Sequence, residues 1–173
     1  MAETQDITLA SGPLRLVFRR DGDRYGHEIR ILDPRADGGE RVVLSSVEGD
    51  AADACPPSAP FQHLHVEDRT STAGTAEQVA LLVGMAGRGH WSGAIETLPT
   101  GGFLFDLACK TSQAPRFLGG TYRFAGPEIE HLRIELISAA EDGTTLTFAE
   151  ETLSIRAAQA VAGTTRWRYR IGT

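Results

Sequence analysis

Apolar and polar residues alternate along most of this chain with a period of two, the period of a β-strand that buries one face. The clearest case is residues 166–171, where arginines alternate with Trp167, Tyr169 and Ile171. The same alternation recurs over residues 14–19, 24–31 and 131–136. The pattern therefore predicts a protein built mainly of strands.

Two further segments, residues 79–83 and 103–109, are apolar at almost every position. Strands of this kind are covered on both faces, so we expect them at the centre of a sheet. Short glycine-containing sequences, most of them aspartate–glycine or glycine–glycine, separate the segments. They predict tight turns, because glycine adopts the positive φ angles that hairpins need. These signals are Asp21-Gly22, Asp37-Gly38-Gly39, Gly101-Gly102, Gly119-Gly120 and Asp142-Gly143.

Roughly ten to twelve short strands at this spacing predict a single all-β domain over residues 1–173. We expect an antiparallel β-sandwich of the jelly-roll type, with a closed β-barrel as the alternative. A short helix is expected only around residues 156–161. The alternation changes face near Glu150-Glu151, which predicts a bulge or bend there.

The longest irregular stretch, residues 48–60, contains three prolines and the carboxylates Glu48, Asp50 and Asp53. Loops of this length often carry function, but these acids lack the regular spacing of an EF-hand calcium loop. Cys55 lies in this stretch, and Cys109 lies in an apolar segment. They form no Cys-x-x-Cys motif, so no zinc ribbon or thioredoxin-type dithiol is indicated, and a disulfide between them is left open.

Composition removes several function classes. The formal net charge of −6 argues against a nucleic-acid partner, because such domains usually carry a basic excess. Lys110 is the only lysine and has no glycine before it, which excludes a phosphate-binding P-loop. The longest apolar run, about eight residues, is too short for a membrane helix, and the first residues form no apolar signal segment. We expect a soluble, cytoplasmic protein, and its richness in arginine, alanine and glycine suggests a GC-rich bacterial genome.

Two glycine-rich segments carry the candidate ligand-binding residues. Residues 84–93 place His90 and Trp91 among glycines, whose small size would let a ligand approach the backbone. Residues 117–124 place Tyr122 and Arg123 after a glycine pair. An exposed tyrosine near Trp91 would stack on a sugar ring, and an arginine can hold a carboxylate through two hydrogen bonds. The structural alternative is a tight hairpin with Trp91 in the core and a core aromatic at Tyr122.

His63, His65 and Glu67 alternate along one expected strand and therefore project from the same face. Imidazole and carboxylate groups bind divalent transition metals, so a fourth ligand would turn this trio into the centre of a metal-dependent enzyme. In a simple meander His90 is too distant to be that ligand, at about 9–10 Å sideways and about 13 Å along the strands. We therefore expect a solvated strand face and no bound metal.

Two features of the strands themselves leave structural and functional interpretations open. The arginines of residues 166–170 would suit an acidic polymer, a protected sheet edge, or pairing of the final strand with a partner's edge. Asp106 stands in an apolar segment and needs a partner there. Lys110 shares its face, and a neighbouring arginine would serve equally well.

These observations favour a non-enzymatic binding module for a small or carbohydrate-like ligand, with His90, Trp91, Tyr122 and Arg123 as its ligand-binding residues. It would need no cofactor, nucleic acid or membrane. The alternatives are a metal-dependent enzyme using His63, His65 and Glu67, and an interaction or assembly protein. Fold alone does not choose among them.

Overall fold

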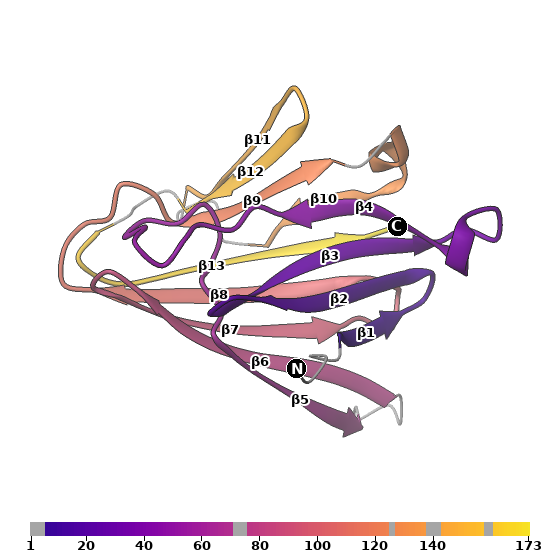
Figure 1. Ribbon diagram of the computed structural model, residues 1–173, viewed down its shortest axis with the longest axis horizontal. Helices are drawn as coiled ribbons and strands as arrows, with labels where there is room; N and C mark the ends of the chain where they lie inside the picture. The colour runs from indigo at the N-terminus through magenta and orange to yellow at the C-terminus, as the bar shows by residue number, and fades with distance from the viewer. Residues whose placement is uncertain (1–5, 71–75, 125–126, 138–142, 158–160) are drawn as a thin grey trace.

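The computed structural model describes residues 6–70, 76–124, 127–137, 143–157 and 161–173 (Figure 1). Within these residues, thirteen strands form two antiparallel sheets that pack face to face, and neither sheet closes on itself. No α-helix occurs in the described part of the chain. The all-β sandwich expected from the alternation is therefore confirmed, and the closed barrel is not formed.

The first sheet has seven strands in the order β1-β2-β3-β4-β9-β12-β11. Its strands are β1 (Ile7–Ser11), β2 (Leu14–Asp21), β3 (Arg24–Leu32), β4 (Glu40–Ser46), β9 (Gly119–Phe124), β12 (Thr152–Arg156) and β11 (Thr145–Ala149). The second sheet has six strands in the order β10-β13-β8-β7-β6-β5. Its strands are β10 (Arg133–Leu136), β13 (Gly163–Gly172), β8 (Phe103–Thr111), β7 (Gly89–Thr97), β6 (Ala76–Ala86) and β5 (His63–Thr70). Two short 3-10 turns are η1 (Asp37–Gly39) and η2 (Pro127–His131).

Consecutive strands stay in one sheet for long runs. Strands β1 to β4 form one meander and β5 to β8 form another, whereas the expected jelly roll is built from two Greek keys. Two of the turns in these meanders lie at glycines that the sequence marks as turn signals. Gly22 has φ +59° between β2 and β3, and Gly101 and Gly102 have positive φ between β7 and β8.

Some local expectations are wrong. Gly119-Gly120 begins β9 instead of forming a turn, and a Cβ on Gly119 would lie 2.0 Å from the carbonyl oxygen of Ile155. At Glu150 and Glu151, where a bulge or bend was expected, the chain bends in the turn of the β11–β12 hairpin, with Ala149 paired with Thr152. Of the helix expected over residues 156–161, Arg156 instead ends β12, and residues 158–160 lie outside the described residues.

The core between the sheets follows the predicted faces. Trp167, Tyr169 and Ile171 of β13 are buried, while the arginines between them lie on the outer face. The ring of Tyr169 stacks on that of Phe105 with centroids 4.6 Å apart. Strand β8 occupies the interior of its sheet, between β7 and β13, as its apolar sequence predicts.

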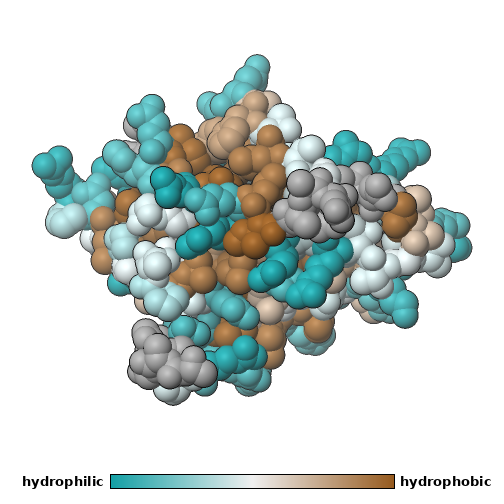
Figure 2. All heavy atoms as spheres, turned by 180° about the vertical axis from the view of Figure 1, so that it is seen from behind, coloured by the Kyte–Doolittle hydropathy of each residue, from teal (hydrophilic) through white to brown (hydrophobic). Residues whose placement is uncertain are grey.

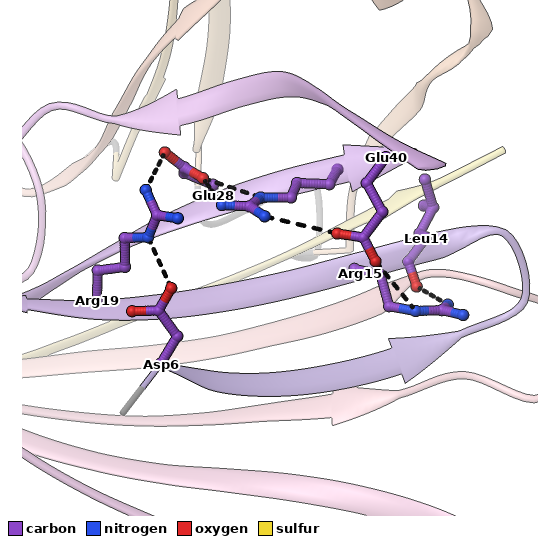
Figure 3. A network of polar contacts seen from close by, with 7 residues as sticks. Asp6, Leu14, Arg15, Arg19, Glu28 and Glu40 are labelled. Carbon is purple, nitrogen blue, oxygen red and sulfur yellow. Dashed lines mark hydrogen bonds and ion pairs between the residues drawn. The ribbon is translucent and has the colours of Figure 1, made fainter. Parts of the chain in front are cut away.

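The outer face of the seven-stranded sheet is held by a chain of ion pairs, which Figure 3 shows across β2, β3 and the start of β4. In order along the face, its members are Asp6, Arg19, Glu28, Arg30, Glu40 and Arg15. Nitrogen–oxygen distances between successive members run from 2.6 to 3.9 Å. Because acidic and basic groups alternate, each of these six charges has a neighbour of opposite sign.

Residues 47–62 carry the chain from one sheet to the other, and their last part enters the sandwich. Phe61 is buried, and its backbone oxygen accepts a hydrogen bond from Tyr25 N–H at 2.7 Å. Two strand glycines make room for this segment. A Cβ on Gly84 would lie 1.7 Å from the carbonyl oxygen of Pro60, and a Cβ on Gly93 would lie 3.1 Å from the ring of Phe61.

Candidate functional site

The four sequence-predicted ligand-binding residues do not meet at one surface. Trp91 and Tyr122 are buried between the sheets, at 4% and 1% exposure. His90 is exposed on the outer face of the six-stranded sheet, and Arg123 is exposed on the seven-stranded one. The expected platform of an exposed tyrosine beside Trp91 is therefore not formed, because Tyr122 is a core residue.

The glycines of residues 84–93 divide into two groups. Gly84 and Gly93 face the interior and accommodate Pro60 and Phe61, so the close approach that they permit is to the chain itself. Gly87 and Gly89 lie at the β6–β7 turn. Gly87 has φ +55°, and a Cβ there would lie 2.8 Å from the Cβ of Ala54. The 47–62 segment therefore lies close against the β6–β7 turn at Ala54.

His63, His65 and Glu67 share a face of β5, as expected, but they do not enclose a common point. His65 has a side chain 74% exposed, and its Nε2 atom lies 3.9 Å from Glu67 Oε1. His90 is on β7, with β6 between the two strands, and pairs with Met85. In the part of the chain that the structure describes, no group of three or more histidine, cysteine, aspartate or glutamate residues is arranged to hold a metal ion.

The arginines of β13 have structural partners. Arg166 binds Asp106 through two hydrogen bonds, and Arg168 Nε lies 3.4 Å from the same carboxylate. The carboxylate of Asp106 raises the pKa of the Arg166 guanidinium. Asp106 is thus paired with arginines and not with Lys110. Strand β13 pairs with β8 along most of its length but with β10 only over residues 169–172, so pairing of this strand with a partner's edge stays a prediction.

A pocket of about 440 Å³ opens where three segments meet at one end of the sandwich. The three segments lie on the left in Figure 1. Its walls come from Ala54-Cys55 of the 47–62 segment, the β6–β7 turn and residues 113–118 between β8 and β9. We call it the end pocket. It falls within the size range of small-molecule sites, roughly 300–1,000 Å³.

The base of the end pocket is formed by Trp91, Cys109 and Leu118. The ring of Trp91 meets Trp167 edge to face, with centroids 5.9 Å apart, which fixes it from the interior side. Its indole Nε1 is buried and has no hydrogen-bond partner in the described structure. A Cβ on Gly89 would lie 3.0 Å from this nitrogen and 3.2 Å from Cys109 Sγ, so the lack of a side chain at Gly89 makes room for both groups.

Both cysteines line the end pocket, and both are free thiols. Burial, with a contribution from nearby Cys55, raises the pKa of Cys109 from 9.0 to about 11. Cys55 is only partly buried, so it is the more accessible of the two. Sequence spacing could not place these residues together, because they are 54 positions apart. They come together because the 47–62 segment passes from one sheet to the other beside the end of β8.

The end pocket has a basic rim and no carboxylate. Arg88 and Arg116 are exposed and line it, and no acidic or histidine side chain among the described residues does. The nearby acids cap backbone groups instead. Asp50 accepts from the N–H of Ala52 and Asp53 from that of Cys55. The lining therefore offers an apolar base, an unpaired indole donor and cationic groups, but no general base.

A separate polar network lies inside the sandwich. Tyr122 Oη is 3.0 Å from His27 Nε2 and 2.7 Å from Tyr169 Oη, so it joins β3, β9 and β13 across both sheets. Ser46 Oγ accepts from the N–H of His27 and donates to Glu48 Oε1 at 2.6 Å. Burial lowers the pKa of His27 to about 4 and raises that of Glu48 to about 7. No described cavity is lined by these groups, so we assign the network a structural role.

None of the described residues forms a helix long and apolar enough to cross a membrane. Comparison with protein-family models, with curated proteins and with solved structures finds no match to this chain.

Proposed function

We propose that this chain is a non-enzymatic binding module for a small, partly apolar ligand held in the end pocket. The observation that carries the proposal is the indole N–H of Trp91, a buried donor without a partner at the base of a pocket of about 440 Å³. Buried donors are almost always paired in folded proteins, so an unpaired donor on a residue that lines a cavity is suited to an acceptor on a ligand.

The lining favours binding over catalysis. Trp91, Leu118 and Pro115 provide apolar surface, while Thr111 and Gln113 can fix the orientation of a ligand. The carbohydrate-like ligand expected from the sequence is less well supported, because Trp91 offers little ring face to stack on. A compact aromatic or aliphatic body with a hydrogen-bond acceptor fits the base better.

Titration with the neutral dye N-phenyl-1-naphthylamine tests the proposal. We expect dye emission to rise on binding and tryptophan emission to fall, since Trp91 lines the site. Ala114 is exposed on the pocket wall, so Ala114→Phe should fill part of the space and weaken binding at least about fivefold.

Ala52→Phe is the matched control, because Ala52 is exposed on the 47–62 segment but does not line the pocket. It should leave dye affinity unchanged. Failure of the neutral dye to bind, or equal binding to both variants, would contradict the assignment of the end pocket as the site.

A further inference from the structure

A second, open cleft adjoins the end pocket on the outer face of the six-stranded sheet. It has a volume of about 700 Å³ and is lined by Arg88, His90, Lys110, Thr111 and Ser112. Arg88 and Thr111 also line the end pocket, so the two hollows share a wall. We call this second hollow the outer cleft. Every residue in its lining carries a hydrogen-bond donor.

The strand register explains why these groups gather there. His90 of β7 and Lys110 of β8 are directly paired, which places their side chains on the same face and next to each other. Arg88 lies in the two-residue turn before β7, where Ala86 pairs with Gly89. The cations therefore come from a turn and a strand that rigid sheet pairing holds in place.

The positive charge of the outer cleft is not neutralised by the protein. In the described residues neither Arg88 nor Lys110 forms an ion pair, although the chain as a whole carries a net charge of −6. The neighbours of His90 and Lys110 on this face are Met85 and Thr164, which are uncharged. Asp106 lies on the same strand as Lys110, four residues before it, and its carboxylate is already bound to Arg166.

The remainder of this face is different in character. On the side of the molecule seen in Figure 2, apolar and hydrophilic side chains are interspersed over the six-stranded sheet. Val83 and Met85 of β6 are about half exposed on this face, and Arg166 and Arg168 of β13 are paired with Asp106. On the opposite sheet, the charged groups of Figure 3 alternate in sign and satisfy one another. Among the described residues, the outer cleft thus holds cations without an ion-pair partner, unlike these two arginines of β13 and the charged groups of Figure 3.

We propose that the outer cleft binds the anionic group of the ligand whose apolar body occupies the end pocket, with Arg88 contacting both parts. The inference rests on the proposed function and narrows it to a small amphipathic acid, carrying a carboxylate, sulfonate or phosphate. Lys110 supplies a point charge, Arg88 a planar pair of donors, and Thr111 and Ser112 hydroxyl donors to the anion's oxygens. The apolar part reaches Trp91 across the shared wall.

Two dyes with the same aromatic body test this assignment. 8-Anilinonaphthalene-1-sulfonate is anionic, whereas N-phenyl-1-naphthylamine is neutral. At low ionic strength the anion should bind roughly tenfold more tightly, because two favourable charge contacts of ordinary strength give about that factor. Raising the salt concentration to about 0.5 M should lower the affinity for the anionic dye severalfold and leave the affinity for the neutral dye unchanged.

The double variant R88Q/K110Q should remove the preference for the anionic dye. Its affinity for the anionic dye should fall about tenfold, and its affinity for the neutral dye less than twofold. The matched control is R35Q/R123Q, which changes net charge equally at two exposed arginines that line neither hollow. It should leave both affinities unchanged. Thermal unfolding of each variant checks that the fold is intact.

The outcomes separate the two proposals. If the neutral dye binds in the end pocket but the anion gains nothing, or if R88Q/K110Q weakens both dyes equally, the anion subsite is refuted and the proposed function stands. If R35Q/R123Q weakens the anion as much as R88Q/K110Q does, the overall field and not the outer cleft is responsible, which also refutes the subsite. If neither dye binds, both proposals fail.

Discussion

Glu48 sits where its charged form is poorly stabilised, and we predict that Glu48→Gln stabilises the protein at alkaline pH. Burial raises the pKa of Glu48 from 4.5 to about 7, although a hydrogen bond from Ser46 and the charge of Arg24 both favour the carboxylate. Its Oε2 atom is buried without a partner in the described structure. Glutamine keeps the size of the side chain and an oxygen to accept from Ser46, but carries no charge to desolvate.

The sign follows from proton uptake. Because the pKa of Glu48 is higher in the folded than in the unfolded chain, the folded state retains the proton between pH 4.5 and about pH 7, and stability falls as pH rises through this window. At about 1.36 kcal/mol per pH unit, the difference between 4.5 and 7 corresponds to about 3 kcal/mol of unfolding free energy. About 2 kcal/mol of this falls between pH 5 and pH 8.

Urea unfolding of the wild type and E48Q at pH 5 and pH 8 measures the effect. The variant should gain about 2 kcal/mol more at pH 8 than at pH 5, equivalent to roughly 4–8 °C in melting temperature for a chain of this size. Burial also lowers the pKa of His27 from 6.5 to about 4, so this residue costs stability as pH falls through that range. Both proteins contain His27, so its contribution cancels in the comparison.

Glu130→Gln is the control, since Glu130 is an exposed carboxylate on η2 and should show no pH-dependent gain. The same change in stability for E48Q at both pH values would refute the reasoning. A loss of stability at pH 8 would show that attraction between Glu48 and Arg24 outweighs desolvation of the carboxylate.

Three further predictions concern other parts of the molecule. Iodoacetamide at pH 8 should alkylate Cys55 before Cys109, whose pKa is raised to about 11, and mass spectrometry should find Cys55 protected when N-phenyl-1-naphthylamine is bound. Tyr122→Phe should cost about 2–4 kcal/mol in urea unfolding, because it leaves buried groups of two neighbouring residues unpaired; a cost below about 1 kcal/mol would contradict the network. Glu28→Gln should cost about 1 kcal/mol at low salt and less in 1 M NaCl, whereas a salt-independent cost would show that the ion pairs of Figure 3 contribute little.

The sequence indicated only some of the residues that line the end pocket and the outer cleft. The glycine-rich segment 84–93 contains the β6–β7 turn and Trp91, which line the end pocket, yet Arg88 and the thiols of Cys55 and Cys109 carried no local signal. Nothing in the sequence distinguishes an unpaired arginine from one bound to a carboxylate. Tyr122 shows the opposite error, since a tyrosine after two glycines resembles an exposed ring until its partners are known.

The sequence by itself determined the strands, their buried faces and several turns, because alternation and glycine φ preferences act between residues that are adjacent in the chain. It therefore indicated that Trp167 would point inward and that Gly22 would form a hairpin. Only the tertiary structure decided the order of the strands, and with it the two hollows and the internal network. Tyr122 meets His27 across 95 residues and Tyr169 across 47, and the walls of the end pocket come from three separate segments. Such contacts depend on which sheet each strand joins and in what register, a choice made by packing of the whole core and not by any local pattern.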